Sequence, residues 1–307
     1  MWPRPLRAGD TVAVVSPSSP VPVDRLAAGI EVLRSWGLRP REGRHARAVH
    51  GHLAGSDAQR VDDLNAAFRD PAVRAVWASR GGYGVTRILD RLDWAALRRD
   101  PKLLIGFSDM TGLLVAARQR TGLIGVHGQF VARLHLLEAR ARVWLRDLVF
   151  GRGAPAWIRG ARLPGAPLGR VTAPLVGGNL AVLAALAGTG DRLRAAGCVV
   201  LLEEVAEAPY AVDRLLTQLR HSGCLRGSAG LAVGTPVGCD PAPGRQSATV
   251  EAVLEERLAG LGVPVVTGLA LGHVDHQRAV PHGAPATLDA DRGALRVCGD
   301  LGGPAPG

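Results

Sequence analysis

A serine at a corner between an apolar run and a helical pattern is the first candidate for chemistry. In Gly106-Phe107-Ser108-Asp109, the apolar run 102–107 ends and the helical pattern 109–122 begins. A serine at such a corner projects above the sheet edge, where it can act as a nucleophile, and the N–H of Asp109 can help to hold an oxyanion. The motif lacks the second glycine of G-x-S-x-G, and serine is also a common helix N-cap. Both interpretations stay open at this point.

A glycine-rich loop is the second candidate. The segment 79–90 follows an apolar run and contains Gly81, Gly82 and Gly84. Glycines let backbone amides approach a ligand closely. The pattern is no dinucleotide fingerprint, because Arg87 stands where that motif needs Gly or Ala. We interpret the loop as the source of a second oxyanion donor, with an ordinary turn as the alternative.

A nucleophilic serine needs a base, and the base needs an orienting partner. The segment 271–283 holds three of the nine histidines, His273, His276 and His282. In the expected strand 198–205, the apolar residues lead into two adjacent carboxylates, Glu203 and Glu204. A carboxylate at the end of a buried strand is costly unless it has a partner, and a histidine is the natural one. A Ser–His–Glu set therefore has a mechanism.

A metal site is the rival interpretation of the same histidines. His273, Asp275 and His276 could together ligate zinc, but their spacing is not H-E-x-x-H and no cysteine cluster supports them. The sequence therefore favours a hydrolase that uses neither a metal nor a cofactor.

Composition limits the partners and the location. The chain has 307 residues, 47% of them hydrophobic, and no apolar run long enough to span a membrane. Its four cysteines form no C-x-x-C pair and no secretory segment is evident, so we expect a cytoplasmic protein with reduced thiols. The net charge is +10, but the arginines are scattered, so nucleic-acid binding is not expected and an anionic small substrate is compatible.

The pattern of predicted helices and strands changes near residue 150. In 1–150, strand and helix patterns alternate, which predicts an α/β domain with a mostly parallel sheet that carries the serine. Its last helix is expected over 131–150. The segment 151–169 is rich in Gly, Pro and Arg, and we interpret it as a linker. The remainder, 170–307, mixes helical patterns with short strands and carries the glutamates and His273.

Six segments, taken in order, resemble the LD-carboxypeptidase family. They are "RGGYGVTRILDRLDW", "LIGFSDMTGLL", "GVHG", "VGGNLAVLAALAGT", "LLEEVAEAPYAVDRLLTQLRHSG" and "GLALGHVDHQRAVPHGAPATL". The resemblance extends from about Gly9 to Val297. It implies a flavodoxin-like N-terminal domain, a smaller C-terminal domain built around a β-barrel, and a homodimer.

The resemblance also implies roles for particular residues. The family's nucleophile falls on Ser108, its glutamate on Glu203 and its histidine on His273, while Glu204 falls on a supporting position. The oxyanion hole falls on the backbone N–H groups of Gly82 and Asp109.

The expected activity is that of a serine-type carboxypeptidase in peptidoglycan recycling, which releases the terminal D-Ala of murein tetrapeptide from an L,D-peptide bond through an acyl-enzyme. One branch of the family cleaves peptidyl- or aminoacyl-nucleotide antibiotics with the same triad and confers self-immunity. A homologue that binds muropeptides without catalysis is a third possibility. The segments 150–170 and 235–247 are expected to shape the substrate pocket.

Overall fold

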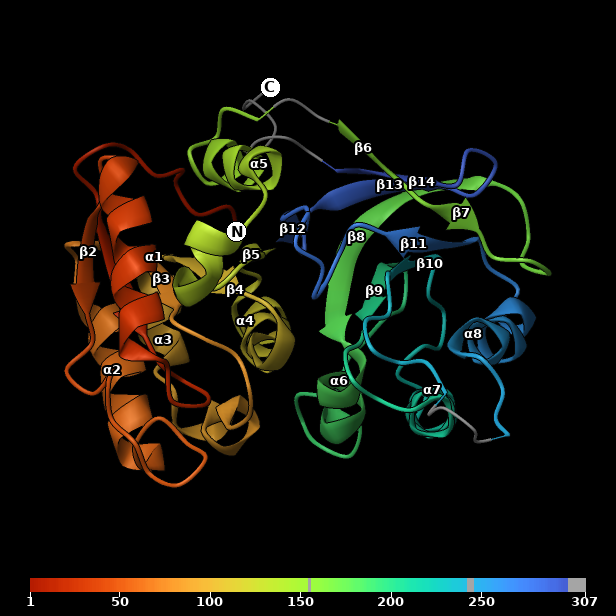
Figure 1. Cartoon of the computed structure of the whole chain (residues 1–307), viewed down its shortest axis with the longest axis horizontal. Helices are drawn as coiled ribbons and strands as arrows, with labels where there is room; N and C mark the ends of the chain where they lie inside the picture. The colour runs from red at the N-terminus through yellow and green to blue at the C-terminus, as the bar shows by residue number, and fades with distance from the viewer. Residues whose placement is uncertain (154–155, 242–245, 298–307) are drawn as a thin grey trace. The chain divides into compact units, whose positions relative to one another are not determined.

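The computed structural model describes residues 1–153, 156–241 and 246–297. Figure 1 shows the whole chain, which divides into two compact units. The first unit combines Met1–Ala154 with Ala279–Gly283, and the second combines Pro155–Arg278 with Ala284–Cys298. Residues 279–283 therefore leave the second unit and return to the first, which the expected continuous region 170–307 did not include.

The first unit is built on a six-stranded sheet with the order β12-β5-β4-β3-β1-β2. Strands β1 to β5 are all parallel, and their order, read as 2-1-3-4-5, is that of the flavodoxin fold. The predicted flavodoxin-like class is thus confirmed. The parallel strands are β1 (Thr11–Val15), β2 (Arg39–Glu42), β3 (Val73–Ala78), β4 (Leu103–Gly106) and β5 (Gly125–His127).

Helices connect the strands of this sheet. They are α1 (Val23–Ser35), α2 (Asp57–Arg69), α3 (Trp94–Arg99), α4 (Thr111–Thr121) and α5 (Ala139–Val149). The apolar stripes of α1 and α5 pack in one buried cluster with alternate side chains of β1 and β3, because a helix with 3.6-residue periodicity and a strand with two-residue periodicity each present one apolar face. The predicted helix over 131–150 is wrong in part, since a short 3₁₀ helix, Val131–Leu136, precedes α5.

A late strand completes the sheet at its edge. Strand β12 (Val280–His282) pairs antiparallel with β5, so that His282 lies opposite Gly125 and Val280 opposite His127. The side chains of His127 and His282 are both buried. Burial, with the nearby His127 and Arg118, lowers the pKa of His282 to about 3. This imidazole is therefore neutral in the folded protein at ordinary pH.

The His282 pKa predicts an acid-sensitive first unit. Below pH 6.5 the imidazole of His282 is protonated in the unfolded chain but stays neutral in the folded chain until about pH 3. Its contribution to the free energy of unfolding is therefore fully present above pH 6.5 and is lost as the pH falls toward 3. We expect His282→Asn to flatten this part of the profile of thermal midpoint against pH. The exposed His50, changed to Asn, should leave the profile as it is. An unaltered acid slope in His282→Asn would contradict the assignment.

The second unit holds an eight-stranded sheet with the order β6-β14-β13-β8-β9-β10-β11-β7. Its edge strands, β6 and β7, are separated along the chain by Gly160 alone, so one kinked segment joins both edges and closes the sheet into a barrel. This confirms the predicted α/β class with a barrel-containing second part. The strands are β6 (Ala156–Arg159), β7 (Ala161–Arg162), β8 (Arg170–Asn179), β9 (Val199–Glu203), β10 (Gly230–Gly234), β11 (Val265–Leu269), β13 (Pro285–Asp289) and β14 (Ala294–Val297).

The segment 151–169 is not a plain linker, because it contains both β6 and β7. These strands are short, and the kink between them needs glycine. A Cβ on Gly160 would lie 2.2 Å from the carbonyl oxygen of Thr267. The helices of this unit are α6 (Leu180–Leu186), α7 (Pro209–His221) and α8 (Val250–Leu258), and they pack in sequence order. Among the described residues, no helix is both long enough and apolar enough to cross a membrane.

Candidate active site

Ser108 lies at the carboxyl end of β4, where the chain turns into a short 3₁₀ helix, Ser108–Met110, ahead of α4. Its hydroxyl caps neither helix, because the capping positions are Phe107 and Met110 and neither cap is closed by a side-chain hydrogen bond. The N-cap interpretation of Ser108 is therefore wrong. The serine is only partly buried, so its side chain is open to a reactant.

The backbone of Ser108 is strained. Its φ is +54°, in the left-handed region that residues with a Cβ seldom adopt. Such a conformation costs on the order of 1–3 kcal/mol and survives where the surroundings enforce it, commonly at functional sites. A Cβ on Gly106 would lie 2.7 Å from Cγ of Met110, so the tight turn needs glycine two residues earlier. These features are those of a nucleophile elbow.

The glycine-rich loop packs directly against Ser108. A Cβ on Gly81 would lie 3.2 Å from the Cβ of Ser108 and 2.5 Å from Cζ of Phe130. Gly82 has a φ of +116°, and a Cβ there would lie 2.2 Å from Oγ of Ser19. The loop therefore runs beside the serine in a conformation that only glycine allows at these positions.

Two backbone amides at this edge are available to a ligand. The N–H groups of Gly82 and Asp109 donate to no acceptor among the residues that the structure describes. Both residues follow strands at the carboxyl edge of the sheet, one after β3 and one after β4, close to the β1/β3 switch point where doubly wound sheets bind ligands. The arrangement suits an oxyanion hole.

In the second unit, His273 pairs with Glu203. Nδ1 of His273 lies 2.8 Å from Oε2 of Glu203, which is the last residue of β9 and is 2% exposed. A Cβ on Gly272, whose φ is +89°, would lie 2.5 Å from that oxygen, so this glycine makes room for the pair. A carboxylate on Nδ1 fixes the tautomer and directs Nε2 away from the carboxylate, as a general base requires.

The adjacent Glu204 has a different task. Its carboxylate accepts hydrogen bonds from Nδ2 of Asn179 at 3.0 Å, the amide of Ala181 at 2.8 Å and the amide of Val205 at 2.8 Å. Burial raises its pKa, and these donors oppose the rise. Glu204 therefore anchors the start of α6, whereas Glu203 holds His273.

The other predicted histidines lie elsewhere. His276 is exposed, and His282 is buried in the first unit against β5. One residue that the sequence interpretation missed supports His273: the buried Gln277 donates from Nε2 to the carbonyl oxygen of Gly272 at 2.7 Å. No pattern marks a glutamine that folds back on its own loop, so only the structure reveals it.

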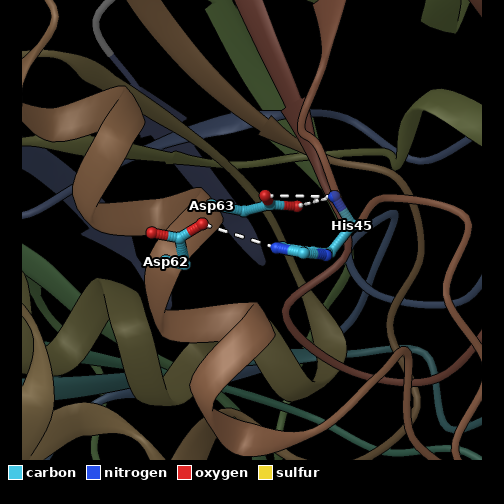
Figure 2. Close-up of side chains that lie close together, drawn as sticks. All are labelled: His45, Asp62 and Asp63. Carbon is cyan, nitrogen blue, oxygen red and sulfur yellow. Dashed lines mark hydrogen bonds and ion pairs between the residues drawn. The ribbon is translucent and has the colours of Figure 1, made fainter.

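His45, Asp62 and Asp63 form the one cluster among the described residues whose three possible metal ligands lie within 4.8 Å of one another. Figure 2 shows both oxygens of Asp63 facing the backbone amide of His45, at 3.1 and 3.0 Å. Nε2 of His45 lies 3.4 Å from a carboxylate oxygen of Asp62. These contacts anchor the loop after β2 and explain the cluster without an ion. The alternative set of His273, Asp275 and His276 forms no such cluster.

Because protein contacts account for the His45, Asp62 and Asp63 cluster, we predict that activity survives removal of metal. Dialysis against a strong chelator should leave the hydrolysis rate of the purified enzyme unchanged. A loss that zinc restores would contradict the serine mechanism.

Comparison with known proteins identifies the chain. A model of the LD-carboxypeptidase N-terminal domain matches residues 12–128, and one of the LD-carboxypeptidase C-terminal domain matches residues 172–288. The matches define a peptide hydrolase. The chain belongs to the LD-carboxypeptidase family, which confirms the resemblance.

Named relatives and a solved structure of a relative support membership in this family. A Streptomyces coelicolor protein named as a carboxypeptidase is 45% identical over 303 residues, or 96% of this chain and 95% of the relative. Murein tetrapeptide carboxypeptidase of Pseudomonas aeruginosa is 36% identical, with 92% and 94% covered. The crystal structure of muramoyltetrapeptide carboxypeptidase from Oxalobacter formigenes superposes with a TM-score of 0.83 at 30% identity, with 94% and 97% covered.

The chain is also similar to a self-immunity protein. The microcin C7 self-immunity protein of Escherichia coli is 24% identical over 317 residues, with 95% of this chain and 94% of the relative covered.

Proposed function

We propose that this LD-carboxypeptidase is a serine enzyme that releases the terminal D-Ala of murein tetrapeptide by hydrolysis of an L,D-peptide bond. The observation that carries the proposal is Ser108 at the carboxyl end of β4, because its backbone is strained and its hydroxyl caps no helix. The names of the Pseudomonas and Oxalobacter relatives support the substrate. A place in peptidoglycan recycling, in the cytoplasm and as a homodimer, belongs to the same proposal.

In the proposed mechanism, Oγ of Ser108 attacks the scissile carbonyl while Nε2 of His273 accepts its proton. The amides of Gly82 and Asp109 stabilise the oxyanion of the tetrahedral intermediate. His273 then donates the proton to the nitrogen of the leaving D-Ala, and an acyl-enzyme remains on Ser108. Water, deprotonated by His273, hydrolyses this ester and restores the serine.

Glu203 holds the imidazole in the required tautomer and stabilises the imidazolium that forms twice in each cycle. Its burial makes this interaction strong, because few water molecules screen a carboxylate that is 2% exposed. In this proposal Ser108 belongs to the first unit and the Glu203–His273 pair to the second, so we expect that neither unit alone is active.

The test is a side-by-side assay of the purified enzyme on murein tetrapeptide and on an aminoacyl-adenylate analogue. Release of D-Ala from the tetrapeptide at a much higher kcat/KM supports the proposal. Faster cleavage of the adenylate analogue assigns the chain to the self-immunity branch instead. Tetrapeptide binding without turnover of either compound would identify a non-catalytic homologue. Part of the segment 235–247 expected to shape the pocket, residues 242–245, lies outside the described residues.

A further inference from the structure

The carboxyl group of Asp109 has no part in the mechanism above, which uses only the backbone N–H of this residue. Asp109 is 2% exposed. Its Oδ2 accepts hydrogen bonds from Oγ of Ser18 at 2.6 Å and from the amide of Val85 at 2.9 Å. Ser18 follows β1, and Val85 lies in the glycine-rich loop after β3. One side chain next to the proposed nucleophile thus joins three loops at the carboxyl edge of the sheet.

A second buried side chain, that of Arg60, holds the same loop. Arg60, 1% exposed, donates from Nη1 to the carbonyl oxygen of Gly84 at 2.8 Å and to that of Pro17 at 2.5 Å. It also forms an ion pair with Asp57. The carbonyl of Gly84 and the amide of Val85 belong to one peptide group. Arg60 and Asp109 therefore bind the two polar ends of a single peptide plane.

This peptide group is where the loop needs restraint. Gly82 and Gly84 have φ values of +116° and +136°, and glycine imposes little conformational preference of its own. An oxyanion donor works only if it is held within about 0.5 Å of the productive position before the reaction begins. The peptide group that carries the Gly82 N–H contacts Ser19, whose amide donates to the carbonyl oxygen of Gly81 at 3.3 Å and whose Oγ accepts from the amide of Tyr83 at 3.2 Å. Asp109 holds the residue before Ser19 in the chain, Ser18, and the amide of Val85 further along the loop, so its carboxyl group restrains the supports on both sides of the Gly82 amide.

We propose that the carboxyl group of Asp109, together with Arg60, positions the oxyanion donor of the glycine-rich loop relative to Ser108. Asp109 is then bifunctional: its own N–H supplies one donor, and its side chain fixes the loop that supplies the other. The inference rests on the proposed function, because it takes Ser108 as the nucleophile and the Gly82 amide as an oxyanion donor.

The test is Asp109→Ala, which keeps the backbone N–H and removes only the carboxyl group. Loss of one oxyanion donor costs about 10²–10³ in kcat, so we expect a fall of up to about a hundredfold in kcat with KM changed by no more than a few fold. The rate is expressed per active site, counted from the burst of acyl-enzyme. Asp109→Asn should recover part of the loss, because its carbonyl oxygen can still accept from Ser18 and Val85. Should Asp109→Ala not fold, Ser18→Ala removes one of the two bonds and is expected to show a smaller fall of the same kind.

A second readout reports on the hole itself. A peptide boronic acid with boron in place of the scissile carbonyl forms a tetrahedral adduct on serine whose oxygen occupies the hole, so its Kd should rise by the factor by which kcat falls. Asp63→Ala is the matched control. Asp63 is likewise buried, burial raises its pKa as it does that of Asp109, and it accepts a backbone amide, that of His45. This variant should lose stability without losing kcat per active site.

The outcomes separate the two proposals. If Ser108→Ala abolishes hydrolysis while Asp109→Ala keeps kcat and boronate affinity within twofold, the positioning role is refuted and the proposed function stands. If Asp109→Ala lowers only the thermal midpoint, as Asp63→Ala does, the carboxyl group is purely structural. If Ser108→Ala retains activity, the proposed function itself fails.

Discussion

Ser108→Ala is expected to lower the rate of tetrapeptide hydrolysis by several orders of magnitude and to leave the fold almost as stable as before. Covalent catalysis disappears with the hydroxyl, and members of a triad act as a unit, so removal of one typically costs about 10⁴–10⁶ in kcat. Stability should change little because the hydroxyl closes no helix cap and alanine can occupy the same strained φ of +54° no worse than serine. The measurements are the hydrolysis rate and the thermal midpoint of the purified variant.

The matched control is Ser56→Ala in the same unit. Ser56 is a true N-cap: its Oγ accepts the amide of Gln59 at 3.3 Å, and the Gln59 side chain accepts the amide of Ser56 at 2.8 Å. Loss of this cap should cost about 0.5–2 kcal/mol and leave kcat unchanged. The two serine variants should therefore show opposite effects. A folded Ser108→Ala enzyme with more than about a tenth of the parent rate would remove Ser108 from the mechanism, given how much more the loss of a nucleophile costs.

The sequence could predict the corner at Ser108 but could not choose between nucleophile and cap. Residue types determine that a strand ends near Gly106 and a helix begins soon after, and those signals are local. The deciding facts are the φ of Ser108 and the absence of a cap bond, and the turn that sets them packs against Gly81, where an added Cβ would lie 3.2 Å from the Cβ of Ser108. Packing between loops that follow different strands produces no hydrophobic periodicity, so it cannot be predicted from the sequence pattern.

The missed strands have a related cause. Strands β6, β7 and β12 are two to four residues long, and each is defined by its partner. β12 pairs with β5 from more than 150 positions away along the chain, while β6 and β7 bind opposite edges of one sheet. A hydrophobic pattern of that length is too short to distinguish strand from loop. The buried strand β9, by contrast, was expected over 198–205 and is observed close to those bounds.

The two adjacent glutamates show what the residues alone leave undecided. Glu203 and Glu204 end the same apolar run, and both are buried. Glu203 is the last residue of β9 and Glu204 lies just after the strand; the first side chain meets His273, and the second meets Asn179 and the start of α6. Only the family resemblance favoured Glu203 beforehand, and the geometry now gives the physical reason.

His273→Ala is expected to match Ser108→Ala in its loss of rate. Without the imidazole, no group deprotonates Ser108 or protonates the leaving D-Ala, and both half-reactions fail. The double variant Ser108→Ala/His273→Ala should be little slower than either single variant, since the first substitution already disables the unit. The check is kcat for the three variants. Losses that multiply in the double variant would mean that the two residues act independently.

The neighbouring carboxylates provide an internal comparison for this prediction. Glu203→Gln keeps the volume but removes the charge that stabilises the imidazolium and fixes its tautomer, so kcat should fall strongly, by about one or two orders of magnitude less than in His273→Ala. Glu204→Gln should lower the thermal midpoint, because three donors lose a charged acceptor, and should leave kcat per folded enzyme nearly unchanged. If Glu204→Gln were the more damaging to kcat, the base would be oriented by a different carboxylate from the one that lies 2.8 Å from Nδ1 of His273.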